Sequence, residues 1–137
     1  MSPSIPDDVR HFLAEHRYGT IASLDPDGTP HQAVVWYLVE DDALIVNSAD
    51  GRRWPSNLRR DPRFSMAIEE GETNVTLRGT VEIIDDQERA QADIAAMARL
   101  NYDPVTAEAS IRDQYRREKR VSFRLLPARI HAELGED

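Results

Sequence analysis

The segment GTIASLDPDGTPHQAVVWYLVEDDALIVNS, residues 19–48, contains three short apolar stretches separated by two turns. The stretches are rich in β-branched residues and too short for helices, so they predict β-strands. The expected strands cover residues 18–24, 30–39 and 43–48. The sequence DPDG supplies the first turn, where Gly28 takes a positive φ, and the acidic EDD supplies the second. The segment therefore predicts a meander of antiparallel hairpins.

Further strands are expected downstream, over residues 63–69, 74–84 and 120–134. In the sequence NVTLRGTVEII, alternate positions predict one apolar face, and Gly79 indicates a bulge or a barrel corner. The members of this face are Val75, Leu77, Gly79, Val81 and Ile83. In the last strand, Val121, Phe123 and Leu125 alternate before Pro127, which is expected to end or bend it. Six strands of this kind favour a small mixed β-barrel.

Helices are expected around the sheet. Ser4 is predicted to cap a short amphipathic helix that carries Val9, Phe12 and Leu13 on one face. A second helix is expected over residues 52–60, a third from Asp85 or Asp86 to about residue 100, and a fourth from the break NYDPVT to about residue 117. Ala90, Ile94 and Met97 are predicted to face the core. The fold class is therefore α+β, mainly β, with a single domain over residues 1–137.

The composition narrows the class of protein. A chain of 137 residues with 40% hydrophobic and 31% charged residues is typical of one globular domain. The formal net charge of −8 argues against a nucleic-acid partner, and no apolar run is long enough to cross a membrane. The chain has no cysteine, and its amino-terminal residues lack the pattern of a secretory signal. A cytoplasmic protein is expected.

A basic cluster interrupts this acidic sequence in NSADGRRWPSNLRRDPR, residues 47–63, which contains five arginines. Arg52 and Arg53 begin the second predicted helix, where backbone amides point outward and favour an anion such as a phosphate. The alternative is that these arginines are solvated or pair with Asp50 and Asp61. The remaining arginines, Arg59, Arg60 and Arg63, lie at or beyond the end of this helix, where they can bond its last carbonyls, and are interpreted as structural.

Other chemistries have weaker support. The four histidines lack the spacing of known metal-ligand motifs, and no serine lies in a Gly-x-Ser-x-Gly elbow. No glycine-rich nucleotide-binding loop is present.

The second predicted strand is apolar without interruption from Val34 to Val39, which indicates that both of its faces are covered. One face is expected in the core, and the other against a second subunit or a planar ligand; for Trp36, a plain core position is the alternative.

Three segments, GTIASLDPDGTPHQAVVWYLVEDDALIVNS, GRRWPSNLRRDPRFSMAIEEG and LRGTVEII, together resemble the split β-barrel family of pyridoxamine 5'-phosphate oxidase-like proteins. Within that family, the sequence is most similar to a branch of probable oxidoreductases that use the deazaflavin coenzyme F420. The resemblance covers residues 18–84, and a weaker similarity extends over KRVSFRLLP, residues 119–127. It implies a homodimer that binds a flavin or deazaflavin in a groove between its subunits.

The resemblance also implies cofactor-binding residues. Two strands would line the ring system and its neighbourhood, and a basic turn followed by a short helix would hold the phosphate. The matching positions are Pro30, His31, Val34, Asn47, Ser48, Ala49, Arg52, Arg53 and Asn57. At Trp54 the sequence departs from the family, because many relatives have a lysine there that reaches the phosphate. An indole can pack on a cofactor or donate one hydrogen bond, but it carries no charge.

The sequence thus favours an F420-dependent reductase that transfers a hydride to a small unsaturated or quinone-like organic substrate. An FMN-dependent oxidoreductase of the same fold is an alternative, and a non-catalytic cofactor carrier is another, because of Trp54. In a cofactor enzyme the chemistry belongs to the cofactor, so no side chain is assigned as catalytic, although His31 is conceivable as a proton donor. The pocket wall is expected to include the segment 87–117.

Overall fold

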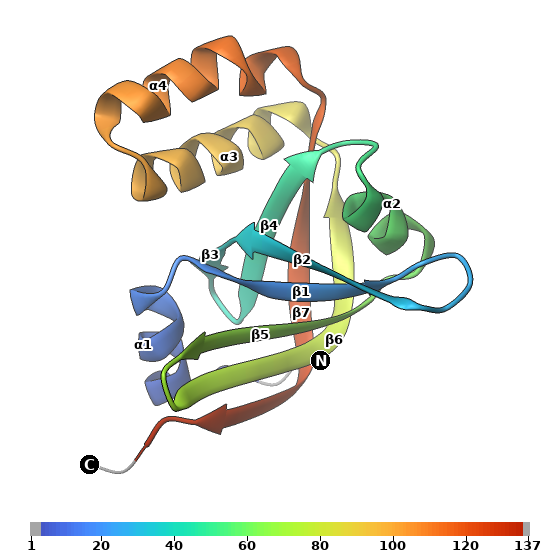
Figure 1. The fold of residues 1–137 in the computed structure, drawn as a ribbon, viewed down its shortest axis with the longest axis vertical. Coiled ribbons are helices and arrows are strands. Elements are labelled where there is room, and N and C mark those ends of the chain that lie inside the picture. The colour runs from blue at the N-terminus through green and yellow to red at the C-terminus, as the bar shows by residue number, and fades with distance from the viewer. Residues whose placement is uncertain (1–3, 136–137) are drawn as a thin grey trace.

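The computed structural model describes residues 4–135, which form a single antiparallel sheet with helices at its margins. Neighbouring strands follow the order β2-β1-β5-β6-β7-β4-β3, and the sheet curls into a half-barrel (Figure 1). The seven strands are β1 (Tyr18–Leu24), β2 (Pro30–Trp36), β3 (Leu38–Glu40), β4 (Ala43–Ala49), β5 (Arg63–Glu70), β6 (Thr73–Ile84) and β7 (Arg120–Glu133). The expectation of a mainly-β structure with at least six antiparallel strands is confirmed.

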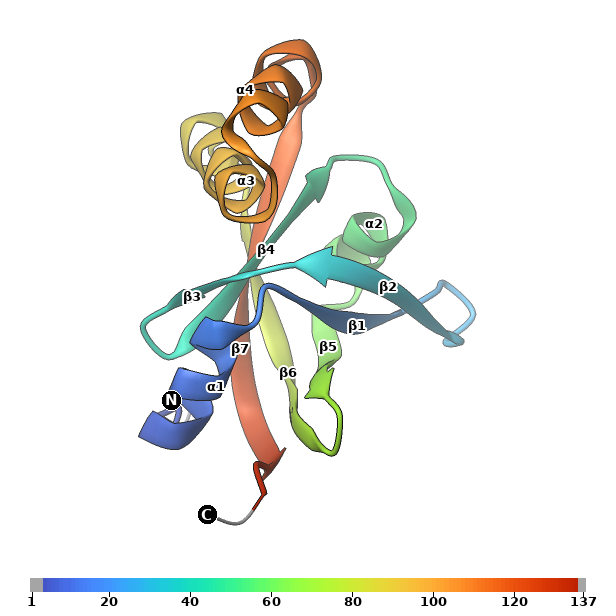
Figure 2. The same ribbon diagram turned by 60° about the vertical axis from the view of Figure 1, so that its left-hand side comes forward.

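The strand predicted over residues 30–39 is interrupted at Tyr37, so that prediction was wrong. Before the interruption, Trp36 pairs with Tyr18 of β1; after it, Leu38 pairs with Ile45 of β4. Tyr37 itself is 3% exposed, and its hydroxyl donates a hydrogen bond to the carbonyl of Leu13 at 2.6 Å. An uninterrupted apolar sequence does not reveal where a strand exchanges one partner for another. In Figure 2, β2 continues directly into β3 across the curled sheet.

The helices lie at the margins of this sheet, with α3 and α4 stacked at one end and α1 at the other (Figure 1). They are α1 (Asp7–Glu15), α2 (Arg53–Arg60), α3 (Gln87–Asn101) and α4 (Pro104–Asp113), followed by the 3-10 helix η1 (Tyr115–Arg117). Within residues 4–135, none of the helices has both the length and the apolar character needed to span a bilayer.

The start of each helix tests the capping predictions. Asp86 caps α3 and accepts a hydrogen bond from the backbone amide of Arg89 at 3.2 Å, as predicted for one of the two candidate aspartates. The prediction for Ser4 was wrong, because Pro6 occupies the N-cap position of α1 and no side chain caps that helix. The last predicted helix is shorter than expected: α4 ends at Asp113 and gives way to η1.

Two hydrophobic clusters hold these layers together. The larger fills the half-barrel and includes Leu13 of α1, Leu58 of α2 and Phe123 of β7. The smaller lies on the opposite face of β4, where Ile45 packs against α3 and α4. Its α3 members include Ile94 and Met97, and Ala90 of the same helix is also buried, as predicted. β4 therefore has a core on each of its faces.

A bulge bends β6 and β7 at Gly79, as the glycine predicted. Arg78 pairs with Arg129 whereas Gly79 pairs with Pro127, so Ala128 has no residue opposite it. A Cβ atom at Gly79 would lie 2.1 Å from the carbonyl oxygen of Leu126.

The expected end of β7 at Pro127 and the expected position of Ile83 on β6 both differ from the structure. Pro127 does not end β7, which continues to Glu133 through the bulge. Ile83 was predicted on the buried face of β6, but it is 42% exposed, because the large cluster ends at Val81 on this strand.

We expect Gly79→Ala to lower the free energy of unfolding by about 2 kcal/mol or more, because the new methyl group would overlap a backbone oxygen that cannot rotate away. Thr80→Ala, at the exposed neighbouring position, is the control and should change it by no more than about 0.5 kcal/mol. Urea denaturation followed by circular dichroism measures both; equal stabilities of the two variants would contradict the close approach at Gly79.

Candidate functional site

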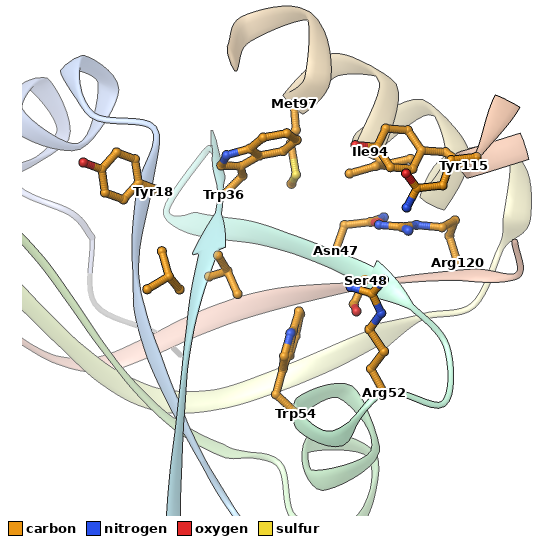
Figure 3. Close-up of a pocket in the computed structure, with 13 residues that line it drawn as sticks. Tyr18, Trp36, Asn47, Ser48, Arg52, Trp54, Ile94, Met97, Tyr115 and Arg120 are labelled. Atoms are coloured by element: carbon orange, nitrogen blue, oxygen red, sulfur yellow. The ribbon is translucent and has the colours of Figure 1, made fainter. Parts of the chain in front are cut away.

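A pocket of about 460 Å³ lies where β2, β4 and β7 meet the helices. In Figure 3, residues at the start of α2 point into it from one side, and residues of α3 and η1 point into it from the other. The thirteen lining residues are Tyr18, Val34, Val35, Trp36, Asn47, Ser48, Arg52, Trp54, Ile94, Met97, Gln114, Tyr115 and Arg120. A pocket of this size, with both apolar walls and polar groups, is typical of a small-molecule site.

One part of the lining is apolar and aromatic. Val34, Val35 and Trp36 of β2 contribute to it, and Ile94 and Met97 of α3 cover it from above (Figure 3). Trp36 is half-buried, and its ring stands edge-on to Tyr102, with 5.1 Å between the ring centroids. Trp36 is thus neither an ordinary core residue nor fully exposed. This wall suits a planar ring system.

The other part of the lining is polar and contains two arginines. β4 runs through its middle and presents Asn47 toward α3 and Ser48 toward α2 (Figure 3), as the alternation of a strand requires. Arg120 lies with Asn47 on the α3 side, and Arg52 approaches from the start of α2. None of the thirteen lining residues is acidic. The pocket is therefore cationic in a protein with a net charge of −8.

Asn47 is fixed by a buried hydrogen-bond network. Its Nδ2 donates to the carbonyl of Ala90 at 2.9 Å and to Oγ of Ser122 at 2.8 Å, and Ser122 in turn donates to the carboxylate of Asp93 at 2.7 Å. These bonds leave Oδ1 of Asn47 to accept from Nε of Arg120 at 3.0 Å. The side chains of Asn47, Ser122 and Asp93 are all bonded within this network, so it holds Nε of Arg120 in one position.

The side chain of Ser48, unlike that of Asn47, has no hydrogen-bond partner within residues 4–135. It is 3% exposed, and within residues 4–135 its Oγ is the buried side-chain polar atom that lacks a hydrogen-bond partner. A buried hydroxyl without a partner is unfavourable, since the cost of removing it from water is not compensated. Because Ser48 lines the pocket, a ligand there would provide the missing partner.

Arg52 and Arg53, the two predicted anion-binding arginines, differ in their surroundings. Arg52 lines the pocket, and its guanidinium makes no hydrogen bond or ion pair with any residue in 4–135. Arg53 points away from the pocket and donates through Nε to Asp25 in the β1–β2 turn at 3.0 Å. That guanidinium holds the pKa of the Asp25 carboxyl well below its usual range, with Asn57 adding a further hydrogen bond. Arg52 is thus available to a ligand, whereas Arg53 fastens the hairpin to α2.

The three later arginines are structural, as the sequence predicted. Arg59 pairs with Asp50 at 3.1 Å and also with Asp85. Arg60 donates to the carbonyl of Leu24 and to the side chain of Asn57, and Arg63 pairs with Asp61 at 2.8 Å. These contacts join α2 to the strands around it.

Trp54 is 9% exposed, and its ring packs on Phe123 with 5.8 Å between centroids. Part of the indole also lines the pocket (Figure 3). Trp54 is therefore a core residue of the half-barrel that presents one side to the site.

The predicted site residues divide into two groups. Five of them line the pocket, and the other five lie outside it. Those in the lining are Val34, Asn47, Ser48, Arg52 and Trp54. Outside it, Pro30 and His31 lie toward the β1–β2 turn, Arg53 and Asn57 are engaged with Asp25, and Ala49 ends β4.

The sequence interpretation did not identify several lining residues, of which Arg120 is the most important. In the sequence, Arg120 stands beside Lys119 at the start of a strand, a position typical of a solvated charge. The expected contribution of the segment 87–117 to the wall is confirmed by Ile94, Met97, Gln114 and Tyr115.

Residues 5–132 match the family model described as pyridoxamine 5'-phosphate oxidase. Among solved structures, a conserved hypothetical protein from Mycobacterium tuberculosis has 27% sequence identity and a TM-score of 0.80, with 97% of this chain and 86% of that chain covered. An F420 reductase has 20% identity and a TM-score of 0.70, over 93% of this chain and 98% of the other. The heme storage protein HutZ from Vibrio cholerae has 18% identity and a TM-score of 0.72, over 97% and 98%.

These similarities confirm the split β-barrel fold that the sequence predicted. At 20% and 18% identity, the latter two structures support the fold alone. They also show that this fold occurs in proteins named for different cofactors.

Ser48 in the pocket lining and Ser122 in the buried network should respond differently to the same substitution. Ser122→Ala should lower the free energy of unfolding by about 1–3 kcal/mol, because it removes the buried hydroxyl that links Nδ2 of Asn47 to the carboxylate of Asp93. Ser48→Ala should leave it within about 0.5 kcal/mol of the wild type, or raise it, because its hydroxyl has no partner to lose. Urea denaturation of both variants is the measurement; a large loss in Ser48→Ala would show that its hydroxyl is bonded within the protein.

Proposed function

Because the chain belongs to the pyridoxamine 5'-phosphate oxidase family, we propose that it is an oxidoreductase that uses coenzyme F420 to transfer a hydride to a small unsaturated or quinone-like organic substrate. The observation that carries this proposal is the pocket itself. It combines an apolar, aromatic wall with a polar part in which Ser48 Oγ and the Arg52 guanidinium have no protein partner within residues 4–135. A ring system with an anionic tail has the complementary chemistry.

The residues present fit such a cofactor. Val34 and Trp36 would lie along its ring system, while Arg52 and Ser48 would hold its phosphate with charged and neutral hydrogen bonds. When bound, the cofactor would supply the hydride chemistry, and the protein would supply position and electrostatics. We assign no proton donor, and His31 lies outside the lining of the pocket.

F420 is preferred over FMN because of the sequence resemblance to the F420-using branch, and an F420 reductase shares the fold. FMN remains the alternative, since a phosphate position at Arg52 would serve either cofactor. Binding experiments distinguish them directly, because both tryptophans of the chain, Trp36 and Trp54, line the pocket and would report occupancy.

We expect F420 to quench the tryptophan fluorescence of the purified protein more strongly and at lower concentration than FMN. Arg52→Gln should weaken cofactor affinity by about tenfold to a hundredfold, as loss of a charge-assisted hydrogen bond would. Arg53→Gln is the matched control: it should leave cofactor affinity nearly unchanged, because Arg53 is already paired with Asp25. Tight FMN binding without any response to F420 would refute the F420 assignment, and equal effects of the two substitutions would refute the role of Arg52.

A second candidate function is a carrier that holds a cofactor without turnover. Trp54 favours it, since the uncharged indole stands where many relatives have a phosphate-binding lysine, and a heme storage protein shares the fold. Reduced F420 mixed with a panel of enones and quinones separates the two functions. Oxidation that the protein accelerates supports the reductase, and identical rates with and without protein support the carrier.

We further propose that the protein is a homodimer whose second subunit covers the open side of the pocket. Two large apolar side chains flank this opening and are strongly exposed: Val34 at 72% and Tyr18 at 63%. Apolar side chains beside a binding groove are typical of an interaction surface. A partner placed there would complete the site.

Val34→Asp should convert the dimer to a monomer and weaken cofactor binding, because an unpaired carboxylate would be buried at the interface. Val105→Asp is the control, since Val105 is 80% exposed on α4 and lies outside the pocket. Light scattering coupled to size-exclusion chromatography measures the mass. A monomeric wild type, or an unchanged dimer in Val34→Asp, would contradict the proposed interface.

A further inference from the structure

Arg120 is a buried cation whose hydrogen-bonding capacity is only partly used. It is 4% exposed; Nε donates to Asn47 and Nη1 donates to Glu118 at 2.8 Å. The guanidinium also lies over the ring of Tyr115, 5.0 Å from its centroid. Within residues 4–135, Nη2 donates no hydrogen bond to the protein, although an arginine offers five N–H donors. Because Arg120 lines the pocket, its remaining donors are available to a ligand.

The charge around Arg120 is incompletely balanced. Glu118 is its carboxylate partner and is itself partly exposed. The pKa of Arg120 is lowered, mainly because the guanidinium is buried. The nearby positive charge of Arg52 lowers it further. Taking a guanidinium out of water is costly unless it is well paired. An anion in the pocket would reduce that cost.

Arg120 and Ser48 lie in the same pocket but on different sides of β4. Asn47 and Ser48 are consecutive residues of β4 and point to opposite faces of the strand, and Arg120 is bonded to Asn47 (Figure 3). Arg120 therefore lies on the α3 side, below the ring of Tyr115, whereas Ser48 lies on the α2 side. The pocket thus has two cationic positions, one on each side of β4.

We propose that Arg120 binds the carboxylate of the substrate, so that the pocket selects small planar carboxylic acids. This inference rests on the proposed function, in which Arg52 and Ser48 hold the cofactor phosphate. The pocket has, on the α3 side of β4, the two features that such a substrate requires: a guanidinium held in place by Asn47, and apolar lining from Ile94 and Met97. A guanidinium that is fixed before binding gives up little entropy when it receives a carboxylate.

The test compares two ligands of nearly the same shape, 2-naphthoate and its neutral amide, 2-naphthamide, by calorimetric titration of the cofactor-free protein. The wild type should prefer the carboxylate by about tenfold to a hundredfold, as charge-assisted hydrogen bonds to Arg120 would give. Arg120→Gln should abolish most of this preference while leaving the affinity for the amide nearly unchanged. Arg129→Gln is the matched control, because Arg129 is an exposed arginine of the same strand outside this pocket.

A second variant keeps the proposal testable if Arg120→Gln does not fold. Glu118→Gln retains a hydrogen-bond acceptor for Nη1 but removes the carboxylate that neutralises Arg120, so it should increase the preference for naphthoate. Equal affinities for the two ligands in the wild type, a preference unchanged in Arg120→Gln or Glu118→Gln, or no naphthoate binding at millimolar concentrations would each overturn the proposal.

A final titration in the presence of saturating cofactor identifies the source of the anion. If naphthoate still binds with the cofactor present, the position belongs to the substrate, as proposed. If the cofactor displaces it, Arg120 holds an anionic group of the cofactor, and the substrate assignment is overturned. The outcome without cofactor depends on neither F420 binding nor turnover, so failure of the proposed function and failure of this inference remain distinguishable.

Discussion

The connection through Tyr37 determines the shape of the molecule. β2 and β3 are the two edge strands of the sheet, yet a single residue separates them in the chain, so the sheet has to curl until its edges meet. Tyr37 secures this closure by burying its ring and donating its hydroxyl to the carbonyl of Leu13. Burial also raises the pKa of the Tyr37 hydroxyl, so it remains protonated and able to donate at neutral pH.

The closure also creates the site. β3 is so short that it pairs only with the first three residues of β4, up to Ile45. The later residues of β4, including Asn47 and Ser48, pair with β7 on one side and meet the pocket on the other. Because successive residues of a strand face opposite ways, this end of β4, which pairs with β7 alone, gives the pocket two chemically distinct sides. The Asn47 amide and Arg120 lie on one side. On the other lies the Ser48 hydroxyl, which has no hydrogen-bond partner among residues 4–135.

The sequence predictions were correct where a feature depends on residues close together in the sequence, and they failed where it depends on residues far apart. β1, the β1–β2 turn and the Gly79 bulge depend on local conformational preferences, and each was predicted correctly. The break at Tyr37 depends on a change of strand partner, which an uninterrupted apolar sequence conceals. Likewise, nothing local distinguishes Arg52 from Arg53, because their difference arises from Asp25, 28 residues away from Arg53. Arg120 was missed for the same reason: the Asn47 amide that fixes it lies 73 residues earlier.

Trp54 is explained by the packing of the half-barrel. Its ring lies against Phe123 in the same cluster as Leu58, so a lysine at this position would bring an ammonium group to an apolar core unless it extended fully into the pocket. The indole instead fills the core and presents one side to the pocket. Positive charge in the pocket then comes from Arg52 and Arg120, which approach from opposite sides of β4. With Trp54 committed to the core, these two arginines are the side chains of the pocket lining that could hold an anion.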